Sequence, residues 1–162
     1  TANKDDSTFL ITDKVYDRAT PIEINSKSNF IDAPDTESIT MSYEYLNQLF
    51  KIASHDNAIS RHTMDRLEKL DVFITENFKV TFGNRIMKQI KMFVPVYVAC
   101  GGTELEALDY MVARKILRKF ESLNLAFMQT EVEELSKYLS KLFGKTEFVE
   151  CQGYLNSIKK QY

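Results

Sequence analysis

Apolar side chains recur every three or four positions from residue 41 to the end of the chain, which is the spacing of one face of an α-helix. Only 5 glycines and 3 prolines occur in 162 residues, so few positions would interrupt helices. The predicted helices begin near Ser42, Ser60, Gly83, Thr103, Val132 and Phe148. We therefore predict a mainly α fold, in which these helices form a bundle.

Polar residues and glycines mark where the helices begin and end. Ser60 is placed to cap one helix, and Thr103 with Glu106 forms a capping-box pattern at the start of another. The run 100–102 (CGG) and Gly144 are expected to end helices, because glycine adopts the left-handed conformation at little cost. The helix from Thr103 is expected to be long and central, because it carries two apolar stripes: Leu105, Leu108, Val112 and Ile116, and Tyr110, Ala113, Leu117 and Phe120.

Residues 1–40 follow a different pattern. An amphipathic stretch spans Lys14 to Arg18, and the alternation over 22–24 (IEI) predicts one short strand. Residues 25–40 contain several Ser, Asn and Asp residues and Pro34, and we interpret them as a linker. We therefore divide the chain into an N-terminal part, 1–40, and a helical domain, 41–162.

Charge and composition argue against several classes of protein. A formal net charge of -2 disfavours a dedicated, strongly basic nucleic-acid binder. No run of apolar residues reaches the length of a membrane span and no signal segment opens the chain, so we expect no membrane partner. Cys100 and Cys151 form no disulfide or metal-binding pattern, which favours a cytoplasmic location.

Two suggestive patterns lack the context that their chemistry needs. Residues 144–146 (GKT) look like the end of a phosphate-binding P-loop, but Leu139 stands at the position of its first glycine, and a helix rather than a strand comes before. His55 and His62 lie near aspartates but have no second pair at the spacing of a zinc site. We predict neither a phosphate loop nor a metal site here.

A basic cluster lies in the second half of the long predicted helix: Arg114, Lys115, Arg118 and Lys119. Acidic residues occupy the first turns of that helix, so the charges complement the helix dipole. We interpret the cluster as a solvated face, with contact to phosphate or to a DNA backbone as the alternative.

Two further segments carry a family resemblance when they are considered together. The first is Asn3 with residues 11–24 (ITDKVYDRATPIEI), and the second is residues 80–90 (VTFGNRIMKQI) with residues 93–102 (FVPVYVACGG). Together they resemble the C-terminal part of AAA+ NTPases, in particular the dynein-related group that includes the GTPase subunit of methylcytosine-specific restriction systems. The resemblance covers most of the chain and implies a helical AAA+ lid preceded by the edge of an α/β core.

The resemblance also implies roles for individual residues. Asn3 matches the sensor 1 asparagine, and Arg18 matches the arginine finger, which acts on the nucleotide of a neighbouring subunit. Gly83 and Arg85 match the F-G-x-R motif, in which the arginine is sensor 2. An asparagine amide can orient a water and donate to a phosphate oxygen, and an arginine fork matches phosphate geometry.

The parts of such an enzyme that hold nucleotide and metal are missing from the sequence. The chain contains no P-loop and no apolar run followed by Asp-Glu, which would bind Mg²⁺. We therefore expect a C-terminal lid fragment of an ATPase or GTPase that uses ATP or GTP with Mg²⁺ as the full-length protein and does not hydrolyse nucleotide alone. The resemblance implies a homo-oligomeric ring of subunits, with a nuclease partner and DNA in a restriction role.

Two other functions remain open from the sequence. One is a non-enzymatic helical interaction domain, in which Arg18 and Arg85 would be far apart and both solvated. The other is a helical DNA-binding module that uses the basic cluster, whose binding would depend steeply on salt.

Overall fold

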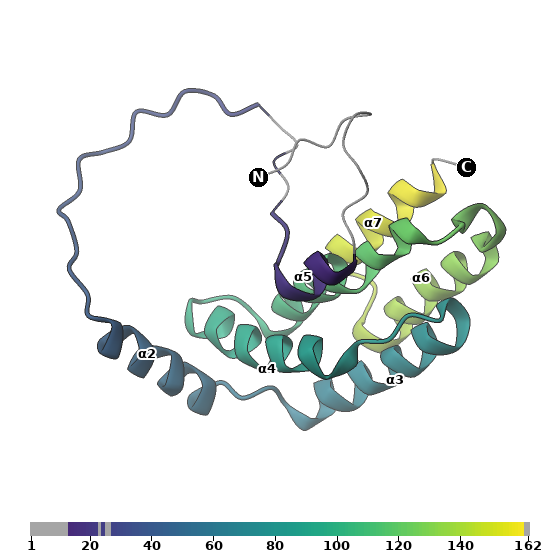
Figure 1. Cartoon of the computed structure of the whole chain (residues 1–162), viewed down its shortest axis with the longest axis horizontal. Helices are drawn as coiled ribbons and strands as arrows, with labels where there is room; N and C mark the ends of the chain where they lie inside the picture. The colour runs from purple at the N-terminus through teal and green to yellow at the C-terminus, as the bar shows by residue number, and fades with distance from the viewer. Residues whose placement is uncertain (1–12, 23, 25–26, 161–162) are drawn as a thin grey trace.

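The structure is a computed structural model that describes residues 13–22, 24 and 27–160. Within that part of the chain every regular element is helical, so the mainly α prediction is confirmed. The elements are α1 (Asp13–Arg18), α2 (Tyr43–Asp56), α3 (Arg61–Phe78), α4 (Gly83–Ala99), α5 (Glu104–Lys115), the 3₁₀ segments η1 (Leu117–Ser122) and η2 (Leu125–Phe127), α6 (Gln129–Phe143) and α7 (Val149–Lys159) (Figure 1).

Helix α5 lies in the middle of the bundle. It packs against α4 and against α7, while α3 packs against α6, and α2 lies along α4 at one edge (Figure 1). None of the residues in the two apolar stripes predicted around α5 is exposed. The prediction that this helix is covered on two sides is therefore confirmed.

One continuous apolar core joins α3 to α7. Stacked rings join its elements: Phe78 of α3 with Phe120 of η1 at 4.4 Å between ring centres, and Phe143 with Phe148, across the turn between α6 and α7, at 4.0 Å. Complete burial of a large apolar side chain contributes roughly 1.5–3 kcal/mol. Packing of this kind fixes the relative positions of the helices that carry the candidate site.

The predicted helix ends are also present. The side chain of Ser60 accepts a hydrogen bond from a backbone N–H of the first turn of α3, and Thr103 and Glu106 form a complete capping box. Gly101 and Gly144 have φ values of +96° and +110° at the ends of α4 and α6, where a side chain would be strained.

The long helix predicted from Thr103 to Phe120 is interrupted, so that prediction is wrong beyond Lys115. Helix α5 ends at Lys115, and the chain continues through Ile116 into the tighter turns of η1. Because a 3₁₀ helix aligns side chains three positions apart, Leu117 and Phe120 face the same side, and both are buried. The change of period therefore keeps the second stripe in the core.

The short strand predicted near 22–24 does not form at the described residues. Ile22 and Ile24 are 80% and 88% exposed, and Glu23 lies outside the described residues. A strand needs a neighbour for its backbone groups, and none of the described chain runs beside this segment as a strand. Residues 27–42 instead form an exposed arc that leads to α2 (Figure 1).

Helix α2 has an uncovered apolar face. Only Ala53 is buried in this helix, although the predicted stripe of large apolar residues is present: Tyr43, Leu46, Leu49 and Phe50, all exposed. Exposed apolar surface of this kind commonly marks a protein–protein contact. No helix in the described part of the chain has both the length and the apolar character needed to cross a membrane.

A carboxylate joins the start of α5 to the start of α3. Glu104 accepts hydrogen bonds from the backbone N–H of Ser60 at 2.8 Å, from the Ser60 hydroxyl at 2.9 Å and from the Thr63 hydroxyl. Burial raises the pKa of Glu104, but the hydrogen bonds from Thr63 and Ser60 lower it by more, so its pKa lies below the ordinary value of 4.5. The ionised form therefore stabilises the folded protein.

Replacing Glu104 by glutamine is expected to remove a pH-dependent part of the stability. The ionised side chain contributes stability that is fully present above about pH 4.5 and is lost as the pH falls through the lowered pKa of the folded state. Thermal unfolding measured from about pH 7 to about pH 3 should show a loss of stability in the wild type that is smaller in Glu104→Gln. Glu133→Gln, which changes an exposed carboxylate of α6, should retain the wild-type profile. Parallel profiles for the wild type and Glu104→Gln would contradict this assignment.

Candidate functional site

The predicted arginine finger lies at the end of α1. Arg18 is the last residue of this helix, and its side chain is exposed. The backbone N–H of Ala19 donates to the carbonyl oxygen of Val15 at 2.8 Å and completes the last turn. No described residue forms a hydrogen bond or ion pair with the Arg18 guanidinium.

The turn before Arg85 is fixed to α3. The backbone N–H of Phe82 donates to a carboxylate oxygen of Asp71 at 3.0 Å, and the side chain of Phe82 is completely buried. Gly83 follows with a φ of +59°, a conformation that costs glycine little and other residues more. This turn places Arg85 in the first turn of α4 with its side chain exposed.

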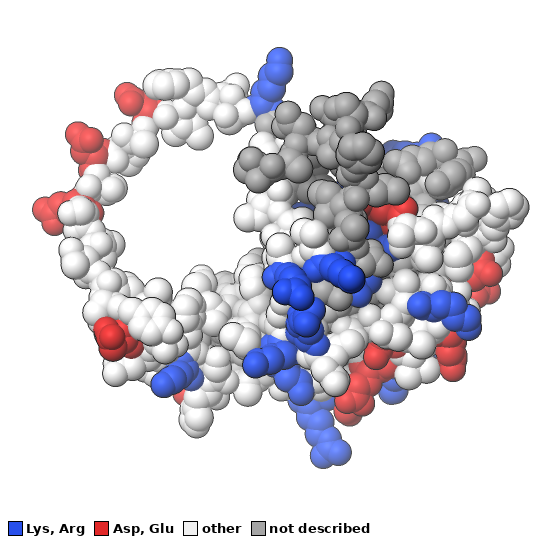
Figure 2. Space-filling model, in the orientation of Figure 1, with Lys and Arg blue, Asp and Glu red and all other residues white. Residues whose placement is uncertain are grey.

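The stretch around Arg85 has a strongly positive charge. No Asp or Glu occurs from residue 77 to residue 103, whereas this stretch contains four basic residues, all exposed: Lys79, Arg85, Lys88 and Lys91. Figure 2 shows Lys and Arg side chains gathered in a band over α1 and α4. A stretch with several exposed cations and no Asp or Glu of its own favours contact with anionic groups such as phosphates, although the Asp71 carboxylate of α3 lies beside the turn at Phe82.

The structure describes two of the predicted polar site residues, Arg18 and Arg85, but not the third, Asn3. Asn3 lies outside the described residues. Arg18 and Arg85 are both exposed, as the interaction-domain alternative expects; Arg18 is on a helix that packs on η1, and Arg85 is on a helix that packs on α2 and α5. No hydrogen bond or ion pair joins these two arginines to each other or to another described residue.

The basic cluster on α5 and η1 is not a solvated face, and that interpretation is wrong. Lys115 is 0% exposed, and the side chains of Arg114 and Arg118 are only 22% and 12% exposed. The burial of Lys115 could have been predicted from its position, because it stands three residues after Val112, on a side of the helix that faces the core.

The arginines of this cluster have internal partners. Arg114 lies 3.4 Å from the Glu150 carboxylate, and Arg118 lies 3.2 Å from that of Glu121. Both arginines line a cavity of about 350 Å³ between α5 and α7, with Pro21 at its edge. A cluster that is paired and half-buried in this way does not favour the DNA-binding alternative.

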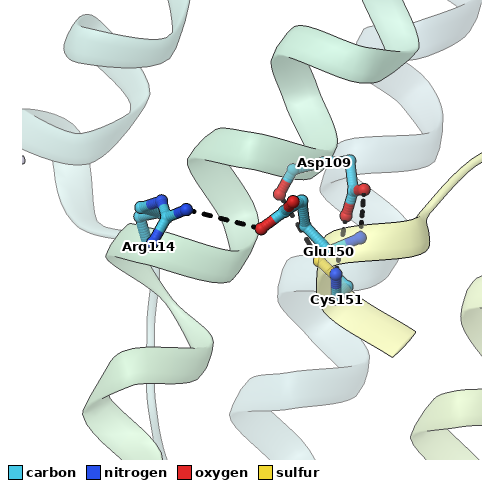
Figure 3. A network of polar contacts seen from close by, with 4 residues as sticks. All are labelled: Asp109, Arg114, Glu150 and Cys151. Atoms are coloured by element: carbon cyan, nitrogen blue, oxygen red, sulfur yellow. Dashed lines mark hydrogen bonds and ion pairs between the residues drawn. The ribbon is translucent and has the colours of Figure 1, made fainter. Parts of the chain in front are cut away.

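Asp109 is a buried carboxylate that the sequence analysis assigned only to the dipole of its own helix. It lies on α5 and accepts hydrogen bonds from the backbone N–H groups of Glu150 at 2.7 Å and Cys151 at 2.9 Å, at the start of α7 (Figure 3). Burial raises the pKa of Asp109, and the hydrogen bonds lower it by less. Burial, followed by the charge of Asp109, raises the pKa of Cys151 and keeps this thiol protonated.

The patterns that the sequence analysis rejected have structural roles. Gly144 ends α6, and its backbone N–H donates to the carbonyl oxygen of Ser140 at 3.1 Å, so residues 144–146 follow a helix as expected. His55 contacts Asp56 at 2.8 Å on the exposed surface. Within the described ranges, no group of three His, Cys, Asp or Glu residues is arranged to hold a metal ion.

Comparisons of the chain with protein-family models, with curated proteins and with solved structures found no match.

Proposed function

We propose that this chain is the nucleotide-responsive helical lid of an AAA+ NTPase, whose P-loop lies in a part of the protein outside these 162 residues. The observation that carries the proposal is the charge of the stretch from residue 77 to residue 103, which contains four basic residues and no Asp or Glu and places Arg85 in the first turn of α4. The family resemblance supplies the expectation that this arginine contacts the phosphates of ATP or GTP.

The residues around Arg85 are suited to bind the phosphates of a nucleotide rather than its Mg²⁺ ion. The guanidinium of Arg85 offers paired donors to phosphate oxygens, and the rigid turn at Gly83 limits the positions it can take. Mg²⁺ prefers oxygen ligands such as carboxylates, and the stretch around Arg85 contains none. The ligands of a magnesium ion would therefore belong to the part that carries the P-loop, where the bound nucleotide supplies the phosphoryl group.

Arg18 has a separate role in this proposal. It contacts the nucleotide bound to a neighbouring subunit and neutralises charge that develops on the transferring phosphoryl group. Its exposed position at the end of α1, without a partner among the described residues, supports contact across a subunit boundary. The uncovered apolar face of α2 supports assembly with such a neighbour, because a monomer would leave it in water.

The part of the proposal that says what nucleotide hydrolysis is used for rests on the family resemblance alone. Movement of the lid would transmit hydrolysis to a protein or DNA substrate, in a cytoplasmic restriction role with a nuclease partner. The chain by itself is expected to show no saturable hydrolysis of ATP or GTP, and turnover by the purified chain would contradict the proposal.

Replacing Arg85 by alanine tests the proposal most directly. In the protein that contains both this chain and the P-loop, Arg85→Ala is expected to weaken nucleotide binding by about 10-fold or more, since charge-assisted hydrogen bonds to phosphate are lost. Titration with a fluorescent nucleotide measures the change. Lys88→Ala removes an exposed cation from the same helix and should have a much smaller effect. Equal affinities of the wild type and Arg85→Ala would refute the assigned role.

A further inference from the structure

Lys115 is the only charged side chain among the described residues that is 0% exposed. Its ammonium group donates a hydrogen bond to the backbone carbonyl oxygen of Ala19 at 2.5 Å, across 96 positions of sequence. Ala19 directly follows Arg18 at the end of α1. The buried lysine therefore ties the last turn of α1 to the end of α5.

A buried ammonium group is costly unless its hydrogen bonds are made. An apolar residue of similar length would suit this position in the core better, because Val112, Ile116 and Leu117 around it in sequence are all completely buried. The bond to Ala19 is an interaction that an apolar residue could not provide. The lysine therefore gives the carbonyl of Ala19 a fixed position.

Helix α1 needs such an attachment. It has only 6 residues, far too few for a helix that is stable in isolation. Its principal packing partner among the described elements is η1, the segment that begins two residues after Lys115. Lys115 and η1 therefore both attach α1 to the bundle. They lie next to each other in the chain, where α5 ends and η1 begins.

We propose that Lys115 is a positioning residue for Arg18: by holding the carbonyl of Ala19, it orients the end of α1 and the guanidinium exposed there. This inference rests on the proposed function, in which Arg18 acts on a neighbouring nucleotide. It adds a physical link between that arginine and the core of the lid, because Lys115 belongs to α5. A displacement of α5 would move the end of α1 with it.

Acetylation of lysines tests the attachment itself, on the chain as it stands. With acetic anhydride and mass spectrometry, Lys115 should react at least about 100-fold more slowly than the exposed Lys88 of the same molecule, because reagents reach buried groups only through opening. Ala19→Pro removes the hydrogen bond from Ala19 to Val15 and should increase the reactivity of Lys115 by about 10-fold or more, with Lys88 unchanged. Thr36→Pro, in the exposed arc, is the matched control and should leave Lys115 slow. A reactive Lys115 in the wild type, or no change in Ala19→Pro, would overturn the attachment.

A double-mutant cycle tests the positioning role in the protein that carries the P-loop. Lys115→Met is expected to lower turnover by about 10-fold or more at unchanged nucleotide affinity, and Lys115→Met with Arg18→Ala should be no slower than Arg18→Ala alone. Lys115→Arg, which keeps a cationic donor, should recover part of the loss. If the losses of turnover in Lys115→Met and Arg18→Ala add up in the double variant, Lys115 does not act through Arg18, and the proposal is overturned. Ala19→Pro takes the place of Lys115→Met in the cycle if the latter does not fold.

Failure of the proposed function has a different signature. Arg18→Ala would then leave hydrolysis unchanged, which would remove the finger and with it the positioning role. Slow acetylation of Lys115 and its increase in Ala19→Pro would persist, because they depend on the attachment of α1 alone.

Discussion

Hydrolysis of ATP or GTP should fall by about 10³-fold or more when Arg18 is replaced by alanine in the assembled NTPase, in line with the contribution of arginine fingers in other NTPases. The loss should appear in turnover rather than in nucleotide affinity, because the arginine stabilises charge that is greatest in the transition state. Steady-state hydrolysis and equilibrium nucleotide binding, measured on the same samples, separate the two. Lys14→Ala, which removes another exposed cation of α1, is the matched control and should retain nearly full activity.

Mixing subunits shows whether Arg18 acts across a boundary. Subunits with Arg18→Ala retain Arg85, and subunits with Arg85→Ala retain Arg18. In a random equal mixture, about one interface in four combines an intact nucleotide site with an intact finger, because the contact between ring neighbours is head-to-tail. At a nucleotide concentration that leaves the Arg85→Ala sites mostly empty, the mixture should therefore be more active than either parent. A mixture no more active than its parents would place Arg18 outside the neighbouring site.

The sequence predicted best those features that depend on neighbouring residues in the chain. Ser60, Thr103 with Glu106, and Gly144 act through hydrogen bonds or backbone conformations within a few positions, so their roles follow from local pattern. The central place of α5 followed from its two apolar stripes in the same way. The start of α4 at Gly83 also belongs to this group.

The features that the sequence did not predict depend on contacts between distant segments. Lys115 was interpreted by its charge and its place near the end of a helix, whereas its burial results from packing beneath a segment 96 positions away. The interruption after Lys115 keeps Leu117 and Phe120 in the core, and a stripe with helical spacing does not reveal such a change of period. The two predicted arginines are exposed in the described structure, and their roles stay predictions.

Asp109 is the clearest example of a distant contact with a large energetic effect. Its two carboxylate oxygens accept the first free N–H groups of α7, so the side chain of α5 caps a helix 41 positions further along the chain (Figure 3). The first N–H groups of a helix have no partner within the helix, and an unsatisfied buried donor costs about 1–3 kcal/mol. The place of Asp109 among the acidic residues in the first turns of the helix indicated only a complement to the dipole of that helix, so the contact with α7 was not predicted.

Asp109→Ala is expected to lower the free energy of unfolding by about 2–4 kcal/mol, because the backbone N–H groups of Glu150 and Cys151 lose their acceptors together. Asp109→Asn keeps one acceptor oxygen and should lose roughly half as much. Urea unfolding followed by circular dichroism measures both losses. Asp65→Ala, which removes an exposed carboxylate of α3, should change the stability by less than about 0.5 kcal/mol.

The pH dependence shows which protonation state of Asp109 stabilises the folded protein more. Because the folded pKa of Asp109 is raised by burial, its contribution to stability is greatest below its ordinary pKa of 3.8 and declines as the pH rises through the folded value. This is the opposite direction to Glu104, so the stability difference between the wild type and Asp109→Asn should narrow, not widen, as the pH increases from about 3 to about 6. A difference that widens over this range would mean that the carboxylate is favoured as an anion in the folded protein. Asp109 would then stabilise α7 through its charge, with hydrogen bonds outweighing the cost of burial.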